Sequence, residues 1–227
     1  LPVPKENDES ADDHGQWGAA LHWITANGTD FGLYYVNAHN KAPAYQLNYE
    51  GFLPRDYTIR YFEDIQGYAA SFTTVLGVMN VQGEVSYKTD TPVVLTNGDP
   101  VEGDVFSAQL GGSTVIEPTI LWDDLNVTFE IATVVIDSHD SGELLYDDSA
   151  TAMALRPEFS YLNVMSGLDV KVTLFLQHTF DGVILENQMA EDATTFNIAF
   201  KGIYLNNFSA QVGYTNYFDG GENKLIK

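Results

Sequence analysis

The stretch 193–218 constrains the fold more than any other part of the chain. It reads ATTFNIAFKGIYLNNFSAQVGYTNYF, in which apolar and polar side chains alternate with a period of two on either side of a short break. That period is typical of a β-strand, whereas a helix repeats every 3.6 residues. The two apolar rows align if Tyr204 faces Phe208 across a three-residue turn. The sequence therefore predicts a β-hairpin, with Asn207 in the left-handed conformation that asparagine tolerates.

The length of these strands indicates the kind of sheet they belong to. The first strand of the hairpin covers the 11 residues of 194–204. At about 3.3 Å a residue and a tilt of about 40°, such a strand spans about 28 Å, close to the apolar band of about 25 Å in outer-membrane barrels. Strands of soluble sandwiches are usually shorter.

The same alternation recurs along the chain and predicts ten strands in five hairpins. The connections between them alternate between short and long, and the long ones carry most of the acidic residues. Outer-membrane barrels show this alternation of short periplasmic turns and long extracellular loops. The predicted hairpins are 16–37, 66–88, 104–136, 152–180 and 193–218; the long connections are 38–65, 89–103, 137–150 and 181–192; and 1–15 is predicted to be an extracellular loop.

We therefore expect an all-β chain that forms an antiparallel up-and-down transmembrane β-barrel as a single domain. A soluble antiparallel sandwich with one wet face gives the same period-two signal and is the alternative. In lipid, unpaired strand edges are costly, so the chain either closes on itself or forms part of a larger barrel. We predict the second, with no hydrogen bonds between the strand at 16–25 and the strand at 208–218.

Composition excludes several classes of protein. The 227 residues contain no cysteine, which excludes disulfides and thiolate metal sites, and no run of 18 apolar residues that would indicate a transmembrane helix. The formal net charge of −22 argues against a nucleic-acid partner and makes divalent cations plausible counter-ions. The loop acids do not form an EF-hand pattern, so solvated carboxylates or divalent bridges to lipopolysaccharide explain them better than a calcium site.

Two sets of residues, charged apart from Gln211, are candidates for a transport function. The first set falls on the polar face of the predicted strands, where it would face a barrel lumen, and includes Glu158 and Lys171 as an expected cross-strand pair. The second set lies in a long connection that could fold inward as a constriction. The lumen candidates are Glu84, Glu130, Arg156, Glu158, Asp169, Lys171, Lys201 and Gln211; the constriction candidates are Arg55, Arg60, Glu63 and Asp64.

Catalytic and metal-binding motifs are weak. The run Asp137-Ser138-His139-Asp140 holds the residue types of a hydrolase triad, but neighbours in sequence rarely adopt triad geometry and no Gly-x-Ser-x-Gly elbow is present. The other histidines lack metal-ligand spacing. We therefore expect no enzyme activity, no metal site and no cofactor.

Three stretches resemble one known family. They are GQWGAALHWITANGTDFGLYYVNAHNKAP, RYFEDIQGYAASFTTVLGVMNVQGEVSYK and YLNNFSAQVGYTNYFDGGENKL. They resemble bacterial outer-membrane barrels known only as domain of unknown function 1302, and the chain looks like the C-terminal portion of its longer members. The resemblance implies an integral outer-membrane protein of a Gram-negative bacterium, in contact with lipid and lipopolysaccharide, that works with a periplasmic partner and an inner-membrane exporter.

The expected function is therefore that of an outer-membrane channel or transport component for small or hydrophobic organic compounds. A secreted sandwich that binds or adheres, and an outer-membrane hydrolase, are the alternatives. Detergent dependence would distinguish the sandwich from the other two.

Overall fold

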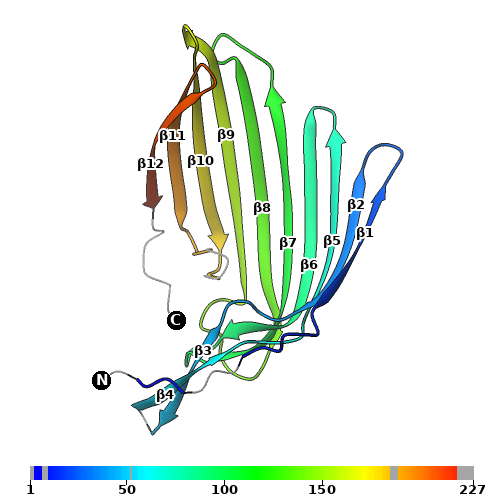
Figure 1. Ribbon diagram of the computed structural model, residues 1–227, viewed down its shortest axis with the longest axis vertical. Helices are drawn as coiled ribbons and strands as arrows, with labels where there is room; N and C mark the ends of the chain where they lie inside the picture. Colours follow the sequence, from blue (N-terminus) through cyan, green and yellow to red (C-terminus); the bar gives the residue numbers. More distant parts are fainter. Residues whose placement is uncertain (1–2, 7–9, 52, 185–188, 219–227) are drawn as a thin grey trace.

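Ten long strands form one antiparallel sheet in the computed structural model, which describes residues 3–6, 10–51, 53–184 and 189–218. Each strand pairs with its neighbour in the chain, apart from two that form a separate small sheet (Figure 1). The order in the large sheet is β1 (Trp17–Ile24), β2 (Asp30–Ala38), β5 (Ile65–Leu76), β6 (Met79–Val94), β7 (Pro100–Ile116), β8 (Asp124–His139), β9 (Ser149–Met165), β10 (Leu168–Asp181), β11 (Thr194–Tyr204) and β12 (Phe208–Phe218).

The small sheet interrupts the connection between β2 and β5. It consists of β3 (Ala44–Glu50) and β4 (Leu53–Arg60), and residue 5 adds a short parallel bridge to Tyr57. Figure 1 shows it at the lower end of the large sheet, where the longer connections lie, whereas the tight turns lie at the upper end. We call these the loop end and the turn end of the sheet. The expected long connection 38–65 thus contains a hairpin of its own.

The register gives the large sheet two chemically different faces. One face, the apolar face, receives at least one exposed large hydrophobic side chain from every strand, and no second layer covers it within the described residues. Leu21, Leu33 and Val212 on this face are 64%, 57% and 69% exposed. From β1 to β12 the exposed set includes Leu21, Leu33, Tyr68, Val85, Leu110, Ile131, Met153, Leu176, Phe200 and Val212.

Aromatic side chains line the apolar face near the loop end. Tyr35, Tyr68, Tyr87 and Phe106 are successive register partners on β2, β5, β6 and β7, so they form one row across four strands. The rings of Tyr35 and Tyr68 lie 5.1 Å apart, centroid to centroid. Aromatic rows occur where a membrane barrel meets the headgroup region, and the tyrosines of this row combine an apolar ring with a polar hydroxyl.

The main buried cluster lies on the opposite face, which we call the polar face, at its loop end. Val134, Ala150 and Ala152 of β8 and β9 pack there against Ile184 and Met189 of the connection between β10 and β11. Val134 is 5% exposed and Ala150 1% exposed. Connections from the loop end therefore fold back over the polar face.

The sheet is open, and β1 and β12 are its two edges. The all-β antiparallel fold is thus confirmed, as is the absence of a ladder between the first and last predicted strands. The described residues contain no helix long and apolar enough to cross a membrane.

The connection 89–103 was predicted wrongly as a loop. β6 continues to Val94 and β7 begins at Pro100, so the connection shortens to 95–99. The ladder between β5 and β6 ends at Lys88. A bulge follows, in which Asp90 has φ 58°, and β6 then continues paired with β7 alone. Pro92 is tolerated beyond this point because β6 then has a neighbour on one side only.

Two turns also differ from prediction. Tyr204 does face Phe208, but the left-handed residues are Leu205 and Asn206, not Asn207, as in a type I′ turn closed by the Asn207 N–H donating to Tyr204. The expected pairing of Glu158 with Lys171 requires a four-residue turn at 163–166 between β9 and β10, but the chain makes a tight turn at 166–167 instead. A bulge then leaves Lys171 opposite Ser160 and Glu158 opposite Thr173, two positions from the predicted register.

Candidate functional site

A cluster of charged side chains lies on the polar face of β9 to β12. The Lys171 ammonium lies 2.7 Å from one Glu158 carboxylate oxygen, and the Arg156 guanidinium lies 3.0 Å from the other. The Thr173 hydroxyl also donates to Glu158 at 3.2 Å. Glu158 and Lys171 thus form an ion pair although their register is diagonal. The single carboxylate at the centre of the cluster is shared among three donors.

Lys171 faces a second cation across the sheet. Its register partner on β11 is Lys201, which pairs in turn with Gln211 on β12. Like charges directly opposite each other destabilise a sheet. Lys201 forms no ion pair with the carboxylates of the described residues. These side chains line a hollow of about 630 Å³ with Asn197 and Thr173.

The remaining lumen candidates lie on the same face but outside this hollow. Glu84 on β6 and Glu130 on β8 line a separate depression of about 210 Å³ over β5 to β8, together with Gln82 and Gln109. Asp169 on β10 accepts a hydrogen bond from the Asn163 backbone N–H at 2.9 Å. The polar face therefore has a mainly acidic half and a half rich in cations.

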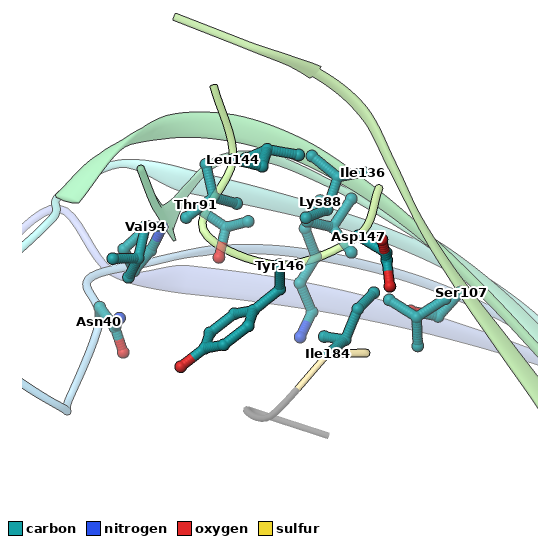
Figure 2. A pocket seen from close by; sticks show the side chains of 14 residues that line it. Asn40, Lys88, Thr91, Val94, Ser107, Ile136, Leu144, Tyr146, Asp147 and Ile184 are labelled. Carbon is teal, nitrogen blue, oxygen red and sulfur yellow. The ribbon is translucent and has the colours of Figure 1, made fainter. Parts of the chain in front are cut away.

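A covered cavity lies at the loop end of the polar face (Figure 2). Its floor is the sheet itself, where Lys88, Val105 and Val134 come from β6, β7 and β8. Its cover comes from the connection 140–148, which carries Tyr146, and from Ile184. The volume is about 270 Å³.

Backbone hydrogen bonds hold the cover in place. The connection 140–148 joins the tip of the β6–β7 hairpin, where the Leu145 N–H donates to Val94 at 2.9 Å and the Thr96 N–H donates to Glu143 at 2.8 Å. The Val183 N–H donates to an Asp147 carboxylate oxygen at 3.0 Å. The loops that fold inward are thus bound to one another as well as to the sheet.

The four constriction candidates lie at the loop end, but the covered cavity is lined by other residues. Arg55 lies 2.5 Å from Asp56 within β4, and Arg60 reaches Glu102 at 3.7 Å. Glu63 accepts from the Asp12 N–H at 2.6 Å, and Asp64 accepts from the Asn37 amide at 3.2 Å. Arg55 also lies 3.9 Å from Glu6, so the four side chains connect separate segments at the loop end.

The carboxylate of Asp56 should make the β3–β4 hairpin sensitive to acid. The Arg55 guanidinium, followed by the Asn48 amide, holds the pKa of Asp56 below its ordinary value of about 3.8. A lowered folded-state pKa stabilises the hairpin at all pH values above the ordinary one, and this contribution is lost as pH falls through the lowered value. We expect exchange protection of β4 amides, corrected for intrinsic rates, to decrease below about pH 4. Asp56→Asn should remove this dependence while Glu50→Gln should retain it, and equal profiles would contradict the assignment.

The hydrolase-like run does not form a triad. The Ser138 hydroxyl donates to Asp104 at 2.9 Å, and His139 Nδ1 lies 2.6 Å from the Asp140 carbonyl oxygen. Ser138 is therefore engaged away from the imidazole. Among the described residues, no three or more histidine or acidic side chains gather in a way that could hold a metal ion.

Sequence reasoning missed the covered cavity. Lys88 is the last residue of the predicted hairpin 66–88, and Tyr146 and Ile184 lie in the predicted long connections 137–150 and 181–192. The available signal was the apolar content of those connections, since LLY at 144–146 and VIL at 183–185 are unusual in acidic loops.

Comparison with known proteins places the chain in a family. The model of the family described as "Protein of unknown function (DUF1302)" matches residues 1–227, so the chain belongs to that family. No curated protein and no solved structure matches the chain.

Proposed function

We propose that this family member is part of an outer-membrane β-barrel that acts as a channel or transport component for small organic compounds. The observation that carries the proposal is the contrast between the two faces of one ten-stranded sheet. Apolar side chains from every strand stand exposed on one face, while charged side chains and folded-back loops occupy the other. In a membrane barrel, these faces meet lipid and lumen respectively.

The apolar face favours a membrane over water. Contiguous exposed apolar patches on soluble monomers rarely exceed a few hundred Å². Here the patch crosses ten strands and ends in an aromatic row at the loop end, Tyr35 to Phe106. A soluble sandwich would need a second sheet over this face. The described residues supply only β3 and β4 beyond the large sheet.

The free edges add a requirement to the proposal. Unpaired backbone groups in lipid cost several kcal/mol each, so the outer sides of β1 and β12 must be paired in the membrane. Closure of the sheet upon itself and pairing with further strands both meet this requirement.

The polar face supports a solute pathway. The acidic half around Glu84 and Glu130 and the cation-rich half around Lys171 and Lys201 would set opposite charges on different walls of a lumen. Loops held at one end would narrow the opening. Solutes would then be selected by size and charge, as in other pores whose walls carry charged side chains.

Reconstitution of the full-length protein tests the proposal. Inserted into planar bilayers, the protein should give discrete conductance steps, and Lys201→Glu should shift the reversal potential in a salt gradient toward cations. The matched variant Lys41→Glu, at an exposed lysine in the β2–β3 connection, should leave the potential unchanged. Insertion without either conductance or uptake of organic solutes into vesicles would refute the transport function while leaving the membrane location intact.

A further inference from the structure

We propose that the covered cavity binds a short aliphatic carboxylate, with the carboxylate at Lys88 and the hydrocarbon chain beneath the folded-back loops. Its role as a solute on the transport pathway rests on the proposed function, whereas binding itself can be measured separately.

The inner part of the cavity is aliphatic. Val93, Val134 and Ile184 line it and are 6%, 5% and 5% exposed. They come from β6, β8 and the β10–β11 connection, so the wall is closed from several sides. Binding of a hydrocarbon chain in this cavity would remove apolar surface of both the chain and the wall from water, which favours binding.

A single cation marks the mouth. Lys88 lines the cavity but remains exposed, and it forms no ion pair with the described carboxylates. Figure 2 shows its ammonium group directed to the same side as the Tyr146 hydroxyl. An ammonium and a hydroxyl at the edge of an aliphatic pocket suit a carboxylate, because charge-assisted hydrogen bonds to lysine are short and strong.

The one acid in the lining does not neutralise this cation. Asp147 accepts the Val183 N–H at 3.0 Å, and in Figure 2 its carboxylate points toward Ser107 and away from the Lys88 ammonium. Asp147 therefore connects the two loop segments that form the cover. Its position leaves the Lys88 charge available to a ligand.

The shape and chemistry exclude other ligand classes. A cavity of about 270 Å³ is near the lower end of the volumes of small-molecule sites, so it suits a short chain and is too small for a large lipid. The lining has eight apolar residues and six polar ones, a composition that suits a hydrocarbon chain with one charged end better than a sugar. An inorganic cation would find one carboxylate in the lining, that of Asp147, which already accepts a hydrogen bond from the Val183 N–H.

Calorimetric titration of the full-length protein in a neutral detergent tests the inference. The probe is hexanoate, compared with hexanol, which lacks the charge, and acetate, which lacks the chain. Hexanoate should bind saturably and at least about tenfold more tightly than either. Hexanol or acetate binding as tightly as hexanoate would overturn the ligand class.

Variants at the mouth complete the test. Lys88→Met keeps the aliphatic stem and should weaken hexanoate binding at least about tenfold, whereas Lys88→Arg should retain it within a few-fold. Lys41→Met is the matched control and should bind as the native protein does. Equal affinities of Lys88→Met and Lys41→Met would overturn the proposal, and so would absence of hexanoate binding to a folded native protein. Conductance measured in parallel separates this failure from failure of the transport function.

Discussion

Arginine in place of Val172 is expected to destabilise the protein in a bilayer by about 2 to 4 kcal/mol if the apolar face meets lipid as proposed, because the side chain would then face lipid near the bilayer midplane. Val172 lies on the apolar face of β10 between Phe159 and Phe200. It follows the turn end by four residues, Leu168 being the first of the strand, which places it about 10 Å below that end for a tilted strand. The measurement is a urea titration of the full-length protein folded into phospholipid vesicles.

The neighbouring position provides the control. Thr173 lies on the polar face, where its hydroxyl already donates to Glu158, so an arginine there can pair with that carboxylate. The expected cost is well below that at Val172. Gln211 and Val212 on β12 form a second such pair. If β10 and β12 faced water on both sides, both arginines would fall within about 0.5 kcal/mol of the native protein. Similar effects at Val172 and Thr173 would therefore reject the lipid-facing assignment.

Local alternation made the strands predictable, while longer-range contacts decided the rest. Apolar and polar side chains alternate with a period of two within each strand, so the order and pairing of the ten long strands could be predicted from the sequence. Bulges at Asp90 and Asn163 could not, because they depend on which neighbours remain paired at the end of a ladder. The diagonal contact between Glu158 and Lys171 follows from the second bulge.

The covered cavity was not predicted because it, too, depends on contacts between residues that are far apart in the sequence. Lys88, Tyr146 and Ile184 are far apart in sequence and meet only because two connections fold back over the polar face. No local sequence pattern predicts which connections fold back over the polar face. Arg55 and Arg60 were predicted as constriction residues because they lie together in a long connection that could fold inward, but the structure pairs Arg55 with Glu6 and Arg60 with Glu102, which joins separate segments. Apolar residues within an acidic connection were the more informative signal.

Gly182 is the position on which the folded-back cover most depends. It has φ +75°, and a Cβ built there would lie 1.8 Å from the carbonyl oxygen of Ser149. The glycine lets the chain leave β10 and bring Val183 and Ile184, 2% and 5% exposed, into the cover. Alanine would therefore have to separate the backbones of Gly182 and Ser149, which also breaks the contact of Val183 with Asp147.

Gly182→Ala should accordingly be much more damaging than an alanine at a glycine that needs only the left-handed conformation. Gly77, in the turn between β5 and β6, has φ +63° and no atom within 4 Å of a built Cβ, so Gly77→Ala should cost about 1 to 2 kcal/mol. Gly182→Ala should cost about 1 to 3 kcal/mol more, because a close-packed backbone contact is added to the same strain. Amide exchange should rise at 182–184 and 143–147 while the central amides of β10 stay protected, since the ladders on both sides of β10 do not involve Gly182. Equal costs for the two variants, or exchange that leaves 143–147 unchanged, would show that the cover is held by its contacts with the sheet and does not depend on the turn at Gly182.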